Sequence, residues 1–484
     1  MRHPLAALLI PELRWDPDHG FSHMQGLVDD ALEFGVGGFV ISNGPCEAVA
    51  TLAATLQKAA GRRLLIAAPA ERGAGAAITG ATGLPPFGAL GALRDEDVIR
   101  RAARLTARDL RTAGVNWALA PCADLAVERA NPFLGARALH HDPQRVAEWA
   151  VAWIDACQAE GVLASAMSLP GEGRALRDPA LGAATVDAPG AGLWGTDLVP
   201  FRAAVDAGVA TVLVSPVSYP QLDTSGAGAA WSRVILRELM RDELQFEGLL
   251  VSPPPSGGAA RALGAEGDAA VAMLAGGCDL ILAPADLAGV HDAVERAIDT
   301  GAVLLDEVEA SAARRAFWAD WARSDEPREP TLDDLLWARQ VADTVVHAVR
   351  GVFTNIGPVV DVIPVDDDVW PAGAAQRVAP FLGTLRAVGL LPRVVDGPTD
   401  EGRGAVCLVV AGEPSSGRGR AGYTEATRAR VVAAVTAARA ARRSIVAVLL
   451  GPPALAEALP EVPNVICAWS ADRAMQEAAA RRLA

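Results

Sequence analysis

Short apolar runs alternate with longer amphipathic segments through the first three hundred residues, and this alternation limits the possible folds most strongly. Each run has the length of a strand that is buried on both faces. The eight runs are Leu5–Ile10, Val36–Ile41, Leu64–Ala68, Trp117–Ala120, Val162–Ala164, Thr211–Val214, Gly248–Val251 and Leu280–Leu282. Strands that alternate with crossover helices predict a parallel sheet. Because there are eight, and no G-x-G-x-x-G follows the first, the pattern favours an α/β fold of the (β/α)8 TIM-barrel type over an open dinucleotide-binding sheet.

The segments between these runs carry apolar residues at helical spacing, often with glycine or a polar residue at their ends. The predicted helices are Met24–Phe34, Cys46–Ala60, Glu96–Ala113, Gln144–Glu160, Leu198–Ala207, Ser232–Leu244, Ala260–Ala275 and Ala285–Thr300. A further helix that contains Trp318 and Trp321 completes the barrel region.

A charged, proline-containing stretch, Ser324–Pro330, reads as a linker between two domains. The predicted domains are therefore a barrel over 1–323, a linker over 324–330 and a smaller three-layer α/β domain over 331–484. In the second domain helices are expected at 331–349, 375–388 and 424–441, and strands at 359–364, 405–410, 444–450 and 464–469. The segment Gly412–Gly422 reads as a mobile polar loop, in which Arg418 and Arg420 would be solvated.

Composition narrows the kinds of partner that the chain can have. A net charge of −15 argues against nucleic acid and against anionic membrane surfaces. No apolar stretch is long enough to span a bilayer. The six cysteines are far apart without a C-x-x-C pair, which favours buried thiols in a reducing cytoplasm. We expect a cytoplasmic monomer or homodimer without a cofactor.

The segment Gly161–Val186 leads from a short apolar run into a polar loop of small residues, as at the active-site face of an α/β barrel. This loop resembles the K-H-F-P-G-H-G-D-T-x-x-D-S-H loop of glycoside hydrolase family 3, in its β-N-acetylglucosaminidase branch. Pro170, Gly171, Gly173 and Asp178 match the pattern. The positions of its lysine, its first two histidines and its acid/base histidine are here Met167, Ser168, Glu172 and Ala180.

Other strand-end loops extend the resemblance over most of residues 1–310. Glu71 and Gly73 match D-Q-E-G-G-R, in which the sugar-holding aspartate and arginine are replaced by Pro69 and Ala74. Asp124 matches A-P-V-x-D, and the stretch from Asn131 to Pro143 resembles N-P-x-I-G-x-R-S-F-G-x-D-P. The resemblance implies that Arg137 binds the sugar; alternatively, Arg137 pairs with Asp124 or Asp142 and only holds its loop.

The segment Phe246–Ser252 resembles F-x-G-x-x-x-S, which in the family leads into the nucleophilic aspartate. Here that position is Pro253. A retaining glycosidase needs one carboxylate to trap the sugar and a second group to protonate the leaving oxygen. Neither Pro253 nor Ala180 can do this, so no catalytic residue is assigned. The C-terminal stretch from Val465 to Ala479 resembles the family's A-Y-S…Q-x-A-A ending.

The resemblance implies a set of candidate substrate-binding residues: Glu71, Asp124, Arg137, Glu172 and Asp178. Three functions remain open at this point. The chain is a non-hydrolytic relative, a pseudoenzyme that binds a carbohydrate or a peptidoglycan fragment; or a β-N-acetylhexosaminidase-type glycosidase with relocated carboxylates, Glu172 among them; or an interaction scaffold without a small ligand.

No metal site is predicted, because the pair His140–His141 has no third ligand at a suitable spacing.

Overall fold

The structure of the chain is a computed structural model that describes residues 4–322, 327–351, 356–369, 377–397 and 404–484. The chain divides into two compact units. The first, called here the barrel unit, comprises Met1–Thr82, Asp95–Glu128 and Ala138–Thr331. The second, called here the C-terminal unit, comprises Gly83–Arg94, Arg129–Arg137 and Leu332–Ala484. Residues 323–326, at the start of the predicted linker, lie outside the described residues.

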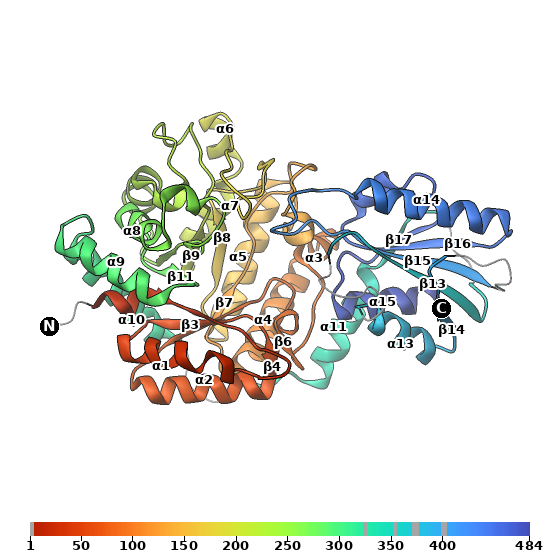
Figure 1. The fold of residues 1–484 in the computed structure, drawn as a ribbon, viewed down its shortest axis with the longest axis horizontal. Helices are drawn as coiled ribbons and strands as arrows, with labels where there is room; N and C mark the ends of the chain where they lie inside the picture. Colours follow the sequence, from red (N-terminus) through yellow and green to blue (C-terminus); the bar gives the residue numbers. More distant parts are fainter. Residues whose placement is uncertain (1–3, 323–326, 352–355, 370–376, 398–403) are drawn as a thin grey trace. The chain divides into compact units, whose positions relative to one another are not determined.

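The strands of the barrel unit, several of which Figure 1 labels, are parallel to their paired neighbours, and their pairing closes a ring. They are β1 (Leu9–Ile10), β2 (Glu12–Leu13), β3 (Gly38–Ile41), β5 (Leu65–Pro69), β7 (Trp117–Leu119), β8 (Ser165–Leu169), β9 (Thr211–Val214), β10 (Leu249–Val251) and β11 (Ile281–Leu282). Ladders join β2, β3, β5 and β7 in that order, then β8, β9 and β10, and β11 pairs with β1. Single parallel bridges, Trp117 to Leu163 and Val251 to Leu280, span the two remaining gaps. With β1 and β2 counted as one strand, the ring has the eight strands of the predicted barrel.

Side chains fill the inside of this ring. The enclosed cluster includes Val40, Leu65, Trp117, Leu249 and Leu280, which come from five different strands or strand starts. Such layers make the interior of a (β/α)8 barrel a packed core rather than a channel. The indole Nε1 of Trp117 donates to Ser165 Oγ at 2.8 Å and to Thr211 Oγ1 at 3.1 Å, so the buried polar atoms in the core are hydrogen-bonded to one another.

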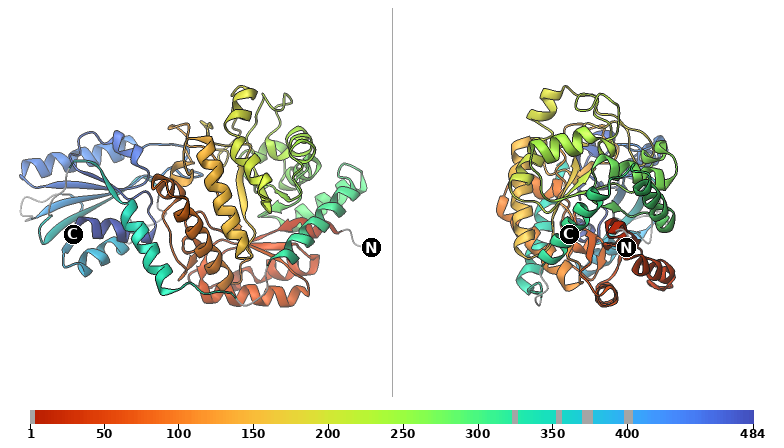
Figure 2. Two further views of the ribbon diagram at one scale, coloured as in Figure 1. Left: turned by 180° about the vertical axis from the view of Figure 1, so that it is seen from behind. Right: turned by 90° about the vertical axis from the view of Figure 1, so that its left-hand side faces the viewer.

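Helices surround the strands in both views of Figure 2. They are α1 (Gln25–Phe34), α2 (Cys46–Ala60), α4 (Glu96–Thr112), α5 (Pro143–Ala159), α6 (Gly190–Gly195), α7 (Val199–Asp206), α8 (Glu266–Gly276), α9 (Leu287–Asp299) and α10 (Leu305–Trp321). Short 3-10 helices are η1 (Pro4–Leu8), η2 (Ser22–Met24), η3 (Ala74–Ala76), η5 (Ala229–Trp231) and η7 (Ala260–Leu263), and η6 (Val234–Glu243) is a wider π-helix. The small strands β4 (Gly44–Pro45) and β6 (Ile78–Thr79) pair with each other. The predicted helices are therefore present, with 232–244 as a π-helix and 260–275 split into η7 and α8.

Two predicted strands differ most from the observed bounds, and the others agree to within two residues at each end. Residues 4–8 form the 3-10 helix η1, so the first strand begins only at Leu9. The fifth strand was predicted at Val162–Ala164, but the ladder with β9 begins at Ser165. Ser165 was passed over because a polar residue interrupts the apolar run, whereas in the structure its hydroxyl is buried and bonded to Trp117 and Thr211.

The C-terminal unit contains a six-stranded sheet between layers of helices. Its strands, in spatial order, are β12 (His347–Arg350), β17 (Val465–Cys467), β16 (Ile445–Leu450), β15 (Ala405–Ala411), β13 (Val359–Asp366) and β14 (Leu391–Val394). All neighbours are parallel except β12 and β17. Its helices are α3 (Phe87–Ala92), η4 (Gly135–Arg137), α11 (Leu332–Val345), α13 (Ala379–Ala387), α14 (Glu425–Ala440), η8 (Pro453–Ala458) and α15 (Arg473–Leu483).

Two separate hydrophobic clusters cover the faces of this sheet. One contains residues of α11, α13 and α15, and the other contains residues of α14. Figure 1 shows α14 on one face and α13 with α15 on the opposite face. The unit is thus the three-layer α/β arrangement that the sequence predicts.

Three expectations for the C-terminal unit need correction. Residues 347–349 were predicted as helix but form β12, and β14 was not predicted because its four residues include Pro392 and Arg393. Arg418 was expected in a mobile, solvated loop, yet its side chain is only 3% exposed and pairs with the buried carboxylate of Asp367. The guanidinium also donates to the carbonyl oxygens of Gly412 and Asp367. The start of the predicted helix 375–388 lies outside the described residues.

Within the described residues, no helix combines the length and apolar character that a bilayer crossing requires.

Candidate active site

The loops at the carboxyl ends of the barrel strands form the face where active sites of such barrels lie. The loop that follows β8, residues 170–186, contains two of the candidate residues that the sequence singled out, Glu172 and Asp178. Its first part is held very close to the loop after β7, because a Cβ added at Gly173 would lie 2.1 Å from the carbonyl oxygen of Leu125. No side chain fits at that distance, so glycine is required there.

Asp124 and Glu172, two of the predicted substrate-binding residues, are brought together by the structure. The backbone N–H of Glu172 donates to Asp124 Oδ1 at 2.7 Å, and the thiol of Cys122 lies 3.5 Å from Asp124 Oδ2. Asp124 is fully buried. It therefore holds the backbone of the β8 loop, whatever other contacts it makes.

The carboxylate of Glu172 is buried as well. Glu172 is 5% exposed, and its Oε1 accepts a hydrogen bond of 2.6 Å from the hydroxyl of Ser215, which follows β9. Ser215 Oγ in turn accepts from the N–H of Val217 at 3.0 Å. Glu172 is therefore not a solvated loop carboxylate. A buried carboxylate needs such donors, because loss of water is costly for a charge.

Tyr219 and Arg174 complete the support of this loop. The hydroxyl of Tyr219 donates to the carbonyl oxygen of Gly171 at 2.9 Å. Burial, followed by the nearby carboxylate of Glu172, raises the pKa of Tyr219 well above its ordinary value, so the phenol stays protonated as a donor. Arg174 Nε donates to both carboxylate oxygens of the buried Asp197, at 3.1 and 2.9 Å.

The later part of the loop contains Asp178 and Ala180. The buried carboxylate of Asp178 accepts a hydrogen bond from the N–H of Ala180 at 2.9 Å. Ala180 lies against the segment that follows β10: a Cβ added at Gly258 would be 2.2 Å from its carbonyl oxygen. In the same place the N–H of Ala259 donates to the carbonyl of Pro179 at 2.8 Å. Thus the strand-end loops of β8 and β10 are in direct contact.

The end of β10 carries no acidic side chain. The sequence after Val251 reads S-P-P-P-S-G-G-A-A. Ser252 is buried; its hydroxyl donates to the carbonyl of Pro253 at 2.8 Å and accepts from the N–H of Leu282 at 3.2 Å. This hydroxyl is therefore used to join β10 to β11.

The two remaining predicted residues occupy different settings. Glu71 follows β5 and is half-buried, and its backbone bridges to Gly73. Arg137 is the last residue of η4, in the C-terminal unit, and is also half-buried. The structure therefore places Asp124 and Glu172 in one hydrogen-bonded group and Asp178 on the same loop as Glu172.

Sequence reasoning missed several polar residues at this face. Glu12 ends the first strand of the ring; its Oε1 accepts from the hydroxyl of Ser42, and its Oε2 accepts from Arg14 at 2.6 Å. Ser215 and Tyr219 were also missed. Only their position could have identified Glu12, Ser215 and Tyr219 from the sequence, because each of them follows an apolar run.

Known proteins share both the sequence pattern and the fold. The sequence model of the Glycosyl hydrolase family 3 N terminal domain matches residues 32–316. A beta-hexosaminidase of Xanthomonas campestris pv. campestris (strain B100) is 36% identical over 241 residues, which are 48% of this chain and 72% of that protein. A beta-N-acetylglucosaminidase/beta-glucosidase of Cellulomonas fimi is 32% identical over 277 residues, 54% of this chain, and the chain spans about half of that protein (49%).

A solved structure extends the likeness of the fold to both units. The glycoside hydrolase family 3 beta-N-acetylglucosaminidase from Paenibacillus sp. str. FPU-7 superimposes with a TM-score of 0.83 at 22% identity. The match covers 99% of this chain and 95% of that one. The family model, the relatives and the fold agree, and the chain belongs to glycoside hydrolase family 3.

Proposed function

We propose that this chain is a non-hydrolytic member of glycoside hydrolase family 3, which binds a carbohydrate or a cell-wall fragment at the barrel mouth without cleaving it. One observation carries the proposal: Pro253 and Ala180 stand where the sequence resemblance assigns the attacking carboxylate and the proton donor. A prolyl ring and a methyl group can perform neither step of retaining hydrolysis. Acid/base catalysis alone contributes roughly 10²–10⁴-fold to a rate.

The carboxylates around these positions support the proposal, because each has a structural partner. Asp124 accepts the N–H of Glu172, Glu172 accepts the hydroxyl of Ser215, and Asp178 accepts the N–H of Ala180. A general acid must release its proton to the leaving oxygen from a position within hydrogen-bond reach. Groups that are buried in the loop scaffold are poorly suited to that task. Glycosidase activity through Glu172 is therefore the less favoured alternative.

The sugar contacts that we propose are the half-buried Glu12 and Ser42 at the ends of the first two strands and Glu71 after the third, because carboxylate and hydroxyl oxygens are groups that bind sugar hydroxyls. The same face also keeps an ordered loop after β8. These features favour binding over a scaffold without any ligand.

One NMR experiment tests binding and cleavage together. The full chain is mixed with N,N′-diacetylchitobiose, or with a muropeptide, and saturation transfer from protein to sugar is recorded for a day. We expect transfer to the N-acetyl protons with the glycosidic bond intact. Glu71→Gln should weaken the transfer, whereas Asp187→Asn, an exposed carboxylate just after the β8 loop, should not.

Two results would contradict the proposal. Cleavage of the disaccharide by the wild-type chain, lost in Glu172→Gln, would establish a glycosidase with relocated carboxylates. No saturation transfer to any of these sugars would instead favour the interaction scaffold.

A further inference from the structure

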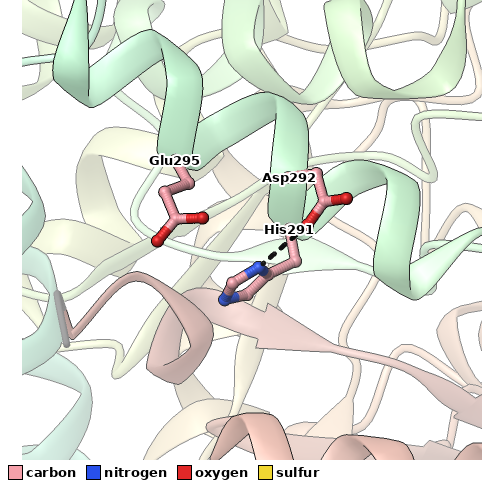
Figure 3. A group of neighbouring side chains, drawn as sticks. All are labelled: His291, Asp292 and Glu295. Carbon is pink, nitrogen blue, oxygen red and sulfur yellow. Dashed lines mark ion pairs between the residues drawn. The ribbon is translucent and has the colours of Figure 1, made fainter.

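Helix α9 carries a group of side chains that no part of the proposed sugar site uses. His291, Asp292 and Glu295 each offer one ligand atom, and these atoms all lie within 4.8 Å of one another. Figure 3 shows the imidazole of His291 facing the carboxylate of Asp292, with Glu295 one turn further along the helix. Among the described residues this is the group of histidine, cysteine and acidic side chains whose spacing suits a metal ion.

The imidazole of His291 is fixed and incompletely bonded. Its ring stacks on Phe34, the last residue of α1, with 4.7 Å between ring centroids and 12° between planes. Its Nδ1 is shielded from solvent and makes no hydrogen bond. Buried polar nitrogens nearly always have a partner, so an unsatisfied one calls for an explanation such as a bound ion.

A second histidine in the chain shows what an ordinary pair looks like. His19 Nδ1 lies 2.9 Å from Asp16 Oδ1, at hydrogen-bond distance. His291 Nδ1 lies 3.6 Å from Asp292 Oδ1, too far for a hydrogen bond. At 3.6 Å the second pair is a loose ion pair, and this separation also fits two ligands of one metal ion.

Coordination distances agree with this gap. Zinc binds histidine nitrogen at about 2.0–2.1 Å and carboxylate oxygen at about 2.0–2.2 Å. An ion placed at those distances from both atoms would see them at an angle of roughly 120°, close to tetrahedral. The carboxylate of Glu295 is exposed, so a rotation of its side chain can bring its oxygen within bonding distance.

We propose that His291, Asp292 and Glu295 form a site for a divalent transition-metal ion of the zinc class. One nitrogen and two carboxylate oxygens are a donor set that suits zinc and its neighbours. A fourth position stays open to water, because Asp292 and Glu295 are exposed. The bound ion would hold the imidazole of His291 in the orientation in which it stacks on Phe34, at the end of α1.

The test uses the full chain after treatment with a chelator. Calorimetric titration with zinc chloride alone should give one ion per chain, and zinc should raise the melting temperature. Asp292→Asn and Glu295→Gln each remove one ligand from an exposed position and should weaken zinc binding by at least about tenfold. Asp16→Asn, which alters the ordinary His19 pair, is the matched control and should leave binding unchanged.

The proposal is overturned if the wild-type chain takes up no stoichiometric zinc, or if the two ligand variants bind it as tightly as the wild type. Cobalt(II) gives an independent check. The proposed donors predict visible d–d bands without a thiolate charge-transfer band; such a band would assign the ion to a cysteine, such as the half-buried Cys46, and would contradict the proposal.

Discussion

At the scale of single residues, Gly173 controls the position of the loop that carries Glu172. A methyl group at this position would meet the carbonyl oxygen of Leu125 at 2.1 Å, and neither backbone can move without disturbing Asp124. We expect Gly173→Ala to lower the free energy of unfolding by about 1–3 kcal/mol, as overpacking does. Urea denaturation measures the loss.

Gly182, in the same loop, is the matched control, because nothing lies within 4 Å of a Cβ added there. Its substitution by alanine should change stability by no more than about 0.5 kcal/mol. Equal effects of the two substitutions would show that the close approach at Gly173 does not exist.

The candidate site was partly readable from the sequence at this scale. Asp124, Glu172 and Asp178 were identified by position, and the structure places all three at strand-end loops. Their hydrogen-bond partners were not identified. Ser215 is 43 residues from Glu172, and Tyr219 is 48 residues from Gly171. No local pattern shows which hydroxyl will meet which acceptor at such separations.

At the scale of elements, helix α4 shows how a local signal sets a boundary. Asp95 precedes the helix, and its carboxylate accepts the N–H of Asp97 at 3.0 Å, as an N-cap residue does. Asp95→Ala should cost about 0.5–2 kcal/mol of stability. Thermal unfolding checks this value against Glu148→Ala, an exposed position within α5; a cap substitution with no larger effect than Glu148→Ala would contradict it.

Most helices were predictable because their apolar spacing is regular; α2 was predicted with its observed bounds. Strands were harder where they contain polar or isolated residues. Because Ser165 is polar, the predicted strand ended at Ala164, one residue before β8 begins. In β14, Leu391 and Val394 are both exposed at the sheet edge, and Pro392 and Arg393 lie between them. The group formed by His291, Asp292 and Glu295, which we propose as a metal site, could not be identified from the sequence because these residues resemble an ordinary charged face of a surface helix.

At the scale of the whole molecule, the sequence motifs that specify the fold do not by themselves establish hydrolytic activity. Eight strand-like runs and several strand-end motifs specified the barrel, and the family assignment agrees with them. By the sequence resemblance, Pro253 and Ala180 stand in these motifs at the positions of the nucleophile and the proton donor, and our proposal of a non-hydrolytic protein rests on this. A fold can persist when its activity is lost, because packing and catalysis depend on different residues.

The proposal that this chain does not hydrolyse glycosides is tested most directly by measuring the release of nitrophenolate from 4-nitrophenyl N-acetyl-β-D-glucosaminide by the wild-type chain. The beta-hexosaminidase of Xanthomonas campestris, assayed beside it, is the reference. The account predicts no release above the protein-free blank, because Pro253 and Ala180 supply neither nucleophile nor proton donor. Release proportional to the concentration of wild-type protein, and abolished in Glu172→Gln, would contradict it.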